Sequence, residues 1–482
     1  MNADPTVLLT PPGQELLARL AAEPGSGGLA LAVRLRREYP ADLVAAATAQ
    51  HELRLAARAK FSRAADMLFT RSGYEQSSSE PIARYRAARF GEARRVADLC
   101  CGIGGDLLAL APGREALAVD RDEVHARLAV HNAAVYGETG NVRALVADVR
   151  DVDLSGLDAI FIDPARRSGP GTASAGSGAP STRPGSASVG IQAASARAGA
   201  AADGPARDSS GAARRFRAGL AEPPLDWCFA LTGRVPAVCV KAAPGLPLDL
   251  LPAGWEAEFI ADGRDLKEAV LWSPALATAP AAGSGGPRRA TVLSGTGPRT
   301  LVAYPGGPVA VTEPGEYLLD PNPAVTRAGL VEDLARSLGD GAGGANDGGA
   351  NDGGANGGGA SGGGASGAGR HGAAAAKIDP RIAFLTVNWP AQTPFARTLR
   401  VLDSAPWNEK RFAKRLRELG IGAADIRRRG LAGDVDQIHR RLKLSGPHRG
   451  TIVITRVNDK PWGLICTDPA PADSVSPADL NG

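Results

Sequence analysis

Apolar and polar residues recur along this chain with two different periods. Between residues 14 and 95, Ala, Leu and Arg dominate, and apolar residues recur three and four positions apart. This spacing predicts amphipathic helices. Between residues 96 and 163, short apolar runs that end in or near an Asp alternate with helical segments such as Glu123–Tyr136. Buried strands that alternate with helices predict a parallel, doubly wound sheet.

The strand pattern returns in the second half of the chain. Apolar runs at 235–245, 256–263 and 268–274 predict further strands of the same sheet. Residues 288–338 predict short strands followed by a helix over 325–338. Residues 378–470 predict strands, two helices and a final hairpin whose tip, Asn458–Asp459, has the chemistry of a two-residue turn.

Glycine and proline mark where this pattern is interrupted. The 482 residues include 61 Gly and 36 Pro, concentrated in stretches at 168–215, 277–290 and 339–376. Such stretches bury too little apolar surface to offset their ordering entropy, and we expect the last one to be a flexible linker. The expected organisation is a helical region at 1–95, an α/β domain at 96–276 with a disordered insert at 168–215, a β/α extension at 288–338, a linker at 339–376 and a small basic α/β domain at 377–470.

Several classes of protein are disfavoured. No uninterrupted apolar stretch approaches 18 residues, so we expect no transmembrane helix. The N-terminus has no basic start before an apolar stretch, which disfavours a signal peptide. Only five Cys are present, two of them adjacent (Cys100, Cys101), and their spacing fits neither a disulfide framework nor a zinc site. We therefore expect a cytoplasmic protein without a metal.

Positive charge is concentrated near the C-terminus. The net charge is +4, yet residues 397–456 hold 15 Lys or Arg against 6 Asp or Glu. Arg is abundant throughout this chain, so the clustering is the informative feature. It predicts contact with nucleic acid, by phosphate and shape recognition because aromatic residues are few. The candidate contacts are Arg427, Arg428, Arg429, Arg440 and Arg441.

The strongest local signal lies between residues 96 and 106, Val-Ala-Asp-Leu-Cys-Cys-Gly-Ile-Gly-Gly-Asp. A strand ends at Asp98, a turn follows with Gly102 and Gly104, and a helix begins near Asp106. Doubly wound sheets bind ligands at this edge. A dinucleotide is disfavoured because residue 107 is Leu rather than Gly and because Asp106 would repel a pyrophosphate. The two carboxylates favour a cationic ligand such as S-adenosylmethionine, which carries a sulfonium and an ammonium group.

Three further Asp residues end the next strands. Asp120 is placed to accept both ribose hydroxyl protons, and Asp148 to accept from an adenine amino group. Asp163 ends the fourth strand and is followed by Pro164. Because four strands end in this way at one edge of the sheet, the sequence predicts a single ligand site there.

At these residues the chain resembles a known family. The segments DLCCGIGGD, AVDRD, HNAAVYG, ALVADV and FIDPARR resemble a class I S-adenosylmethionine-dependent methyltransferase, of the trimethylguanosine-synthase-like branch. The C-terminal run IRRRGLAGDVDQIHRRLKLSGPHRGTIVITRV is similar to a THUMP-like domain. The resemblance implies a Rossmann-like sheet, a methyl donor site and an RNA substrate, tRNA or rRNA. In that family a loop before the sheet closes over the donor, which makes Gln76 and Ser77 candidates, although a helix-capping turn is an equal alternative.

The catalytic position of the family falls on Asp163-Pro164-Ala165-Arg166. An exocyclic amine is a poor nucleophile until its protons are held, and the Asp163 carboxylate and the Pro164 carbonyl can hold them. The family's aromatic residue is missing here, so Arg166 is the candidate to stack on a base or bind a phosphate. A carbon-methylating alternative needs a nucleophilic Cys, for which Cys239 is the candidate, although its place among valines favours a buried, inert thiol.

Three functions remain open at this level. The favoured one is an RNA methyltransferase that methylates a base nitrogen. The others are a non-catalytic protein that binds RNA and S-adenosylmethionine, and a small-molecule methyltransferase. The Asp163-Pro164 pair disfavours the first alternative, and the basic C-terminal region disfavours the second.

Overall fold

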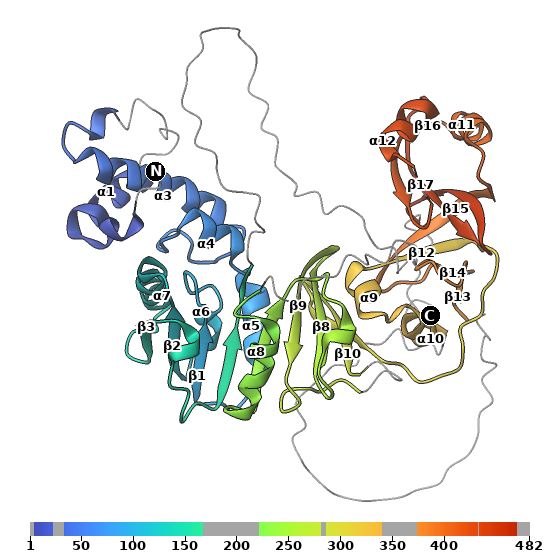
Figure 1. Cartoon of the computed structure of the whole chain (residues 1–482). Coiled ribbons are helices and arrows are strands. Elements are labelled where there is room, and N and C mark those ends of the chain that lie inside the picture. Colours follow the sequence, from blue (N-terminus) through green and yellow to red (C-terminus); the bar gives the residue numbers. More distant parts are fainter. Residues whose placement is uncertain are drawn as a thin grey trace, which may run out of the picture.

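The computed structural model describes residues 4–22, 33–166, 221–280, 286–339, 374–431 and 433–469. Figure 1 shows three parts in the order of the chain: N-terminal helices, a large central sheet and a C-terminal domain beyond the far end of that sheet. The predicted insert at 168–215 and residues 340–373 of the predicted linker lie outside the described residues. The helical region and the doubly wound sheet are confirmed.

The N-terminal region consists of η1 (Pro5–Leu9), α1 (Pro11–Ala22), α3 (Ala41–Ala57), α4 (Arg71–Gln76) and α5 (Glu80–Ala88). Leucines three and four positions apart on α1, such as Leu16, Leu17 and Leu20, are buried in its core. Ile103 and Leu128 of the following domain belong to the same core. The region is therefore packed against the central domain at the segment predicted to bind the ligand.

The central sheet has nine strands in the order β11-β10-β8-β9-β7-β4-β1-β2-β3. Their bounds are β1 (Arg95–Leu99), β2 (Glu115–Asp120), β3 (Val142–Val146), β4 (Ala159–Ile162), β7 (Ala237–Ala242), β8 (Glu256–Asp262), β9 (Asp265–Trp272), β10 (Arg288–Ser294) and β11 (Gly297–Val302). All pairings in the β7-β4-β1-β2-β3 portion are parallel, while β9 runs antiparallel to both β7 and β8. The carboxyl ends of β1, β2, β4, β7 and β8, and the turn from β8 to β9, consequently meet at one edge, which we call the carboxyl edge.

Helices cover both faces of this sheet. One face packs against α5, α6 (Leu107–Leu110) and α7 (Glu123–Val135). The other packs against α8 (Leu225–Ala230), α9 (Pro323–Ala328) and α10 (Val331–Gly339). The buried strands read as continuous apolar runs because both of their faces are covered.

The C-terminal domain is built on a second sheet of seven strands, ordered β13-β14-β12-β15-β18-β17-β16. Its elements are β12 (Tyr317–Pro321), β13 (Ala376–Lys377), β14 (Leu385–Val387), β15 (Ala396–Pro406), α11 (Glu409–Glu418), β16 (Ile421–Arg428), α12 (Val435–Leu442), β17 (His448–Val457) and β18 (Lys460–Thr467). Val457 pairs with Lys460, and both turn residues between them have positive φ, 48° and 64°. The predicted Asn458–Asp459 hairpin turn is confirmed.

The stretch at 288–338 is not a separate extension. Its first two strands complete the central sheet, and its third, β12, lies inside the C-terminal sheet between β14 and β15. The predicted single helix at 325–338 is two helices, α9 and α10, because Gly329 between them adopts φ 69°. Strands β12 and β15 were not predicted, since neither stands out as an apolar run bounded by turn residues.

Strand β12 joins the two parts of the molecule. Its alternate residues Tyr317 and Leu319 pack in the same apolar core as the central sheet, while Leu318 faces the core of the C-terminal domain. The predicted linker therefore falls inside a domain rather than between two domains. The expectation of a linker between two domains is wrong, because β12, which precedes that segment, pairs with β14 and β15, which both follow it.

Within the described residues, no helix has the length and apolar character to cross a membrane.

We predict that residues 341–372 can be deleted without loss of the fold. The flanking ends already lie together, since a β-carbon placed on Gly339 would be 3.6 Å from the β-carbon of Ala374. Shortening a loop between fixed ends should change the free energy of unfolding by less than about 2 kcal/mol. Urea unfolding of the deletion variant and the full chain measures the difference.

The matched variant is truncation after residue 340. It removes β14 and β15 from both edges of β12 and exposes Leu318, so we expect aggregation or loss of a cooperative transition. A truncated protein that unfolds like the full chain would contradict the continuous core described here.

Candidate active site

The turn after β1 has the backbone shape that a bound ligand requires. Cys100, Gly102 and Gly104 all have positive φ, 61°, 53° and 82°. A β-carbon on Gly104 would lie 2.9 Å from the Cα of Ala129, so glycine lets the turn pack closely on α7. Around Gly102 nothing lies within 4 Å of such a β-carbon, so its backbone is open to close approach.

Asp98, at the end of β1, is a buried carboxyl group without a described hydrogen-bond partner. Its side chain is 1% exposed, and neither carboxylate oxygen has a hydrogen-bond partner among the described residues. Burial raises the pKa of Asp98 well above its usual value, and the nearby Asp106 and Asp163 carboxylates raise it further. A buried carboxylate without a partner is costly, and a cationic ligand would remove that cost.

Asp120 is held in position by the backbone of the same site. Its Oδ2 accepts from the Gly102 amide at 2.9 Å, and its Oδ1 accepts from the Asp122 amide at 2.9 Å. Each oxygen keeps a further lone pair. The carboxylate is therefore pre-oriented at the end of β2, at the place where sequence reasoning expects a ribose.

Asp148 differs from the other strand-end carboxylates. It accepts from Arg150 Nε at 2.9 Å and from Arg150 Nη2 at 2.8 Å, and these hydrogen bonds lower the pKa of Asp148 to about 2. Arg150 in turn pairs with Glu222 at 2.6 Å. Only the lone pairs that remain on Asp148 are free for an adenine amino group.

A buried guanidinium connects the turn to the rest of the fold. Arg86 of α5 is fully buried and donates to Asp106, to Glu268 of β9 and to the Ser78 hydroxyl. It also lies over the Phe161 ring at 5.0 Å. Asp106 is predicted from the sequence to contact the ligand, but its Oδ1 accepts from Arg86. A ligand contact through its Oδ2 stays a prediction.

Asp163 is paired with a lysine from the neighbouring strand β7. Lys241 Nζ lies 2.7 Å from Asp163 Oδ2, and the lysine side chain is only 13% exposed. Burial opposes protonation, but Asp163 and then Asp106 and Glu268 raise the pKa of Lys241, so it is an ammonium. The available signal was compositional: Lys241 is one of only 8 lysines among 55 basic residues, and it ends a buried strand.

The residues after Asp163 are described in part. Pro164 is buried. Ala165–Arg166 form β5, which pairs with β6 (Ala221–Glu222). The Arg166 side chain lies outside the described residues, so its predicted role is untested.

Cys239 is inert in this structure. It is fully buried in the middle of β7, between Phe161 and Trp272 in the sheet register. Burial raises the pKa of its thiol well above the usual value. The carbon-methylating alternative therefore has no nucleophile at Cys239.

The segment predicted to cover the donor begins as a helix. Gln76 is exposed at the end of α4, and Ser77 packs so closely on the turn that its Cβ would lie 3.0 Å from a β-carbon on Gly105. Lys60 fastens this segment, donating to the carbonyls of Tyr74 at 2.6 Å and Ser77 at 3.0 Å. Ser77 is thus beside the candidate site, while Gln76 has no described contact in it.

The five predicted RNA contacts do not form one surface. Arg440 and Arg441 are exposed on α12, which covers one face of the C-terminal sheet. Arg427 is exposed on β16 and points to the opposite face, because its neighbour Ile426 packs on the helix side. Arg428 donates to the Leu431 carbonyl.

Arg429 has an internal role instead. It pairs with Asp320 at 2.8 Å, donates to the Ala383 carbonyl at 2.8 Å and lies over the Phe384 ring at 4.5 Å. These contacts occupy its guanidinium inside the junction between the two sheets. The structure therefore gives Arg429 a packing role that the run of three arginines did not predict.

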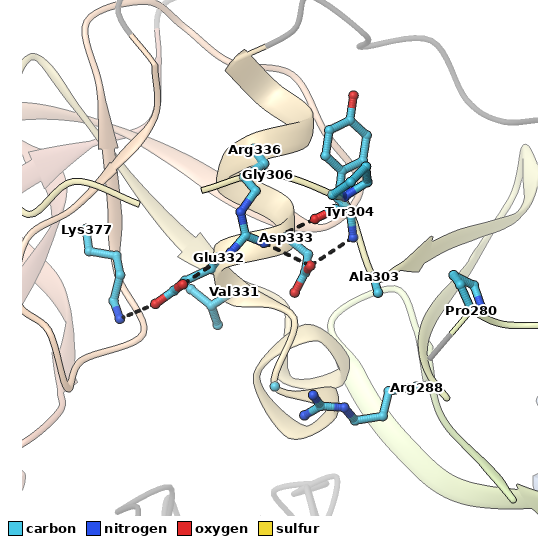
Figure 2. Close-up of a pocket in the computed structure, with 12 residues that line it drawn as sticks. Pro280, Arg288, Ala303, Tyr304, Gly306, Val331, Glu332, Asp333, Arg336 and Lys377 are labelled. Atoms are coloured by element: carbon cyan, nitrogen blue, oxygen red, sulfur yellow. Dashed lines mark hydrogen bonds and ion pairs between the residues drawn. The ribbon is translucent and has the colours of Figure 1, made fainter. Parts of the chain in front are cut away.

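A cavity of about 770 Å³ lies apart from these residues, between β11, α10 and β13. Figure 2 shows two ion pairs among its charged side chains: Lys377 with Glu332, and Arg336 with Asp333. None of the residues predicted for the donor or the acceptor lines it. Across the described ranges, no cluster of His, Cys, Asp or Glu could hold a metal ion.

Family models match three parts of the chain. A model described as RNA cap guanine-N2 methyltransferase matches residues 93–171, and one described as THUMP domain-like matches residues 396–468. Residues 3–57 match a domain of unknown function. The first match covers the turn, Asp98, Asp120, Asp148 and Asp163.

One relative matches most of this chain, and a second matches a short part of it. An uncharacterised S-adenosylmethionine-dependent methyltransferase of Mycobacterium tuberculosis is 30% identical over 396 residues, 81% of this chain and 85% of that protein. A 23S rRNA uracil-C5 methyltransferase of Bordetella avium is 38% identical over 88 residues, 17% of this chain and 18% of that protein. The crystal structure of a putative methyltransferase from Porphyromonas gingivalis shares the fold, with a TM-score of 0.62 at 18% identity over 90% of this chain and 92% of that one.

The turn with its unpartnered Asp98, the family match over 93–171 and the relative matched over most of both chains agree with one another. The chain belongs to the S-adenosylmethionine-dependent methyltransferases, with a THUMP-like domain at its C-terminal end.

Proposed function

We propose that this methyltransferase acts on RNA and methylates an exocyclic amine of a base, in tRNA or rRNA. The observation that carries the proposal is where the C-terminal domain attaches. Arg264, at the tip of the β8–β9 turn, pairs with Asp320 of β12 at 3.1 Å, and the Asn322 side chain donates to the Gly263 carbonyl at 2.8 Å. The domain is thus docked on the carboxyl edge, the same edge that carries Asp98 and Asp163.

The matches support the same substrate. The family models are described as RNA cap guanine-N2 methyltransferase and THUMP domain-like, and one relative acts on 23S rRNA. A basic domain held on the carboxyl edge would keep RNA close to the acceptor site. An RNA substrate also agrees with the cytoplasmic location expected from the sequence.

The residues present fit the methyl donor. Asp98 would take its ammonium group, Asp120 its ribose hydroxyls and Asp148 its adenine amino group, while Gly102 and Gly104 give its chain room. Ser77, beside the turn, would cover it. When bound, S-adenosylmethionine supplies an electrophilic methyl group on a sulfonium.

The acceptor side follows from Asp163 and Pro164. With Oδ2 held by Lys241, Asp163 keeps Oδ1 for one proton of the acceptor amine, and the Pro164 carbonyl would take the other. Holding both protons would release the nitrogen lone pair for in-line attack. Lys241 is then a positioning residue that fixes the rotation of the Asp163 carboxylate.

The first prediction tests the donor role of Asp98. Asp98→Asn should weaken binding of S-adenosylhomocysteine about tenfold to a hundredfold, because a charged hydrogen-bond acceptor is lost. The ligand-free variant should be more stable than the parent at pH 7, since it no longer buries an unpartnered carboxyl group. Calorimetric titration and thermal unfolding measure the two effects.

The pH dependence sharpens this test. Because the pKa of Asp98 is raised in the fold, the parent gains stability as pH falls toward the unfolded value near about 4. The stability advantage of Asp98→Asn should therefore shrink over the same range. Unchanged ligand affinity in the variant would refute the assignment of Asp98.

The second prediction concerns the acceptor carboxylate. Asp163→Ala should reduce methyl transfer about a hundredfold or more and leave S-adenosylhomocysteine affinity nearly intact. Lys241→Met should reduce methyl transfer about tenfold. In the Asp163→Ala background the same substitution should have little further effect, because Lys241 acts through the Asp163 carboxylate. Lys410→Met, exposed on α11, is the matched control. If the losses of activity are additive in the double variant, Lys241 does not act through Asp163.

The third prediction tests the substrate. Incubation of the full chain with labelled donor and total RNA from a strain that lacks the gene should yield a methylated nucleoside, identified by mass spectrometry of the digest. The Asp163→Ala protein is the control and should yield none above background. Label found only in small molecules would overturn the RNA assignment.

A further inference from the structure

Lysines gather at the acceptor site of a protein that otherwise uses arginine. Only 8 of its 55 basic residues are Lys, and three of these, Lys60, Lys241 and Lys267, interact electrostatically with one another. Burial, followed by the charges of Lys241 and Lys267, lowers the pKa of Lys60 to about 8. We call these three residues the lysine group.

A β-bulge places the outermost of these lysines. In the pairing of β8 with β9, Ile260 lies opposite Glu268 and Ala261 opposite Leu266, so Lys267 is the extra residue of the bulge. Bulges re-aim a side chain away from the regular alternation of a strand. Lys267 is 42% exposed, and the one described carboxylate that pairs with it, Asp265, is 3.6 Å away.

Arginines gather where the C-terminal domain meets the same edge. Arg264 and Arg429 pair with Asp320, and Arg397 of β15 lies opposite Asp320 in the strand register. Arg429, Arg397 and Arg427 of β16 act electrostatically on Arg264. Burial lowers the pKa of Arg264, Asp320 opposes this, and the three other arginines lower it further. We call these four residues the arginine group.

The two groups follow each other along the carboxyl edge. Asp163 follows β4, Lys241 is the penultimate residue of β7, Lys267 lies on β9, and Arg264 lies in the turn between β8 and β9. Three steps between neighbouring strands separate β4 from β8, a distance of about 15 Å. Figure 1 shows the C-terminal domain continuing from that end of the sheet.

Positive charge is in excess at the arginine end of this edge, where the four arginines pair with two carboxylates, Asp320 and Asp468. The lysine group is closer to balance, because Asp163, Asp265, Glu75, Asp106 and Glu268 act on it. Like charges held this close repel one another, and the repulsion is relieved by a polyanion.

We propose that the lysine and arginine groups form one track along which the sugar-phosphate backbone of an RNA strand runs from the C-terminal domain to Asp163. This inference rests on the proposed function and names the surface that serves it. The side chains of the track that can reach phosphates are those of Arg427, Arg397, Arg264 and Lys267. Arg429, Lys241 and Lys60 are held by contacts within the protein and add positive charge beside them.

The helix-covered face of the C-terminal domain is the rival surface. Its cations have acidic partners on the same helices and strands: Arg415 pairs with Asp403 and Glu418, and Arg441 with Glu409. That face lies on the side of the sheet opposite to Arg427. RNA bound there would be directed away from the carboxyl edge.

Charge neutralisation in the full chain separates the two surfaces. The track variant is Lys267→Gln with Arg427→Gln, which removes one exposed cation from each group. The matched variant is Lys414→Gln with Arg440→Gln, one Lys and one Arg exposed on α11 and α12. Thermal unfolding and S-adenosylhomocysteine affinity should be unchanged in both, which shows that the fold and donor site persist.

RNA affinity is measured against salt concentration, with bulk tRNA and with a short single-stranded RNA as probes. Each phosphate contact contributes about 0.7–0.9 to the slope of log affinity against log salt. The track variant should lower the slope by about 1.4–1.8, and the helix-face variant should leave it unchanged. A lower slope only in the helix-face variant, or no change in either, would overturn the track while leaving RNA binding itself intact.

A different result would overturn the function on which the track rests. If the parent protein binds neither probe with a salt-dependent affinity, RNA is not its partner and the track fails with the proposed function.

Discussion

The buried guanidinium of Arg86 is the interaction on which the rest of the structure depends. Arg86 belongs to α5, outside the central sheet, and it connects Asp106, in the turn after β1, to Glu268 on β9. Removing one partner of such a buried ion pair costs about 3–5 kcal/mol, because the remaining charges keep no compensation. The helical region, the turn and the sheet are therefore held in one arrangement.

Next to this ion-paired cluster lies an unpaired carboxyl group. Asp98 is as buried as Arg86, yet it has no described partner, and its pKa is raised accordingly. One buried carboxylate has its cation inside the protein, while the other is left for a ligand. The turn can therefore be held rigidly by the Arg86 ion pair and still be stabilised further when a cationic donor binds next to Asp98.

The carboxyl edge extends the same principle over a longer distance. Asp163 is paired with Lys241, and Arg264 and Arg429 share Asp320, so cations exceed carboxylates where the C-terminal domain meets this edge. The domain is fixed to this edge by β12, whose two faces pack in two cores. Under the proposed function, a module fixed in this way would present RNA in one orientation, whereas a tethered one would only raise its local concentration.

The sequence alone determined the features that depend on neighbours in the chain. Short apolar runs ending in Asp fixed the strands and the edge where Asp98, Asp120, Asp148 and Asp163 meet, and Asn458–Asp459 fixed a hairpin, since these follow from local periodicity and turn chemistry. The motif also identified the family, which the comparisons confirm.

Only the tertiary structure decided which charges are paired. Lys241 lies 78 residues from Asp163, and Arg86 lies 182 residues from Glu268, so no spacing in the sequence could join them. The same holds for Arg429, which reads as one of three equivalent arginines until Asp320 is beside it. Likewise, β12 is separated from its partners by the Gly-rich segment, and it became part of the C-terminal domain because strand pairing depends on contact in space rather than on proximity in the chain.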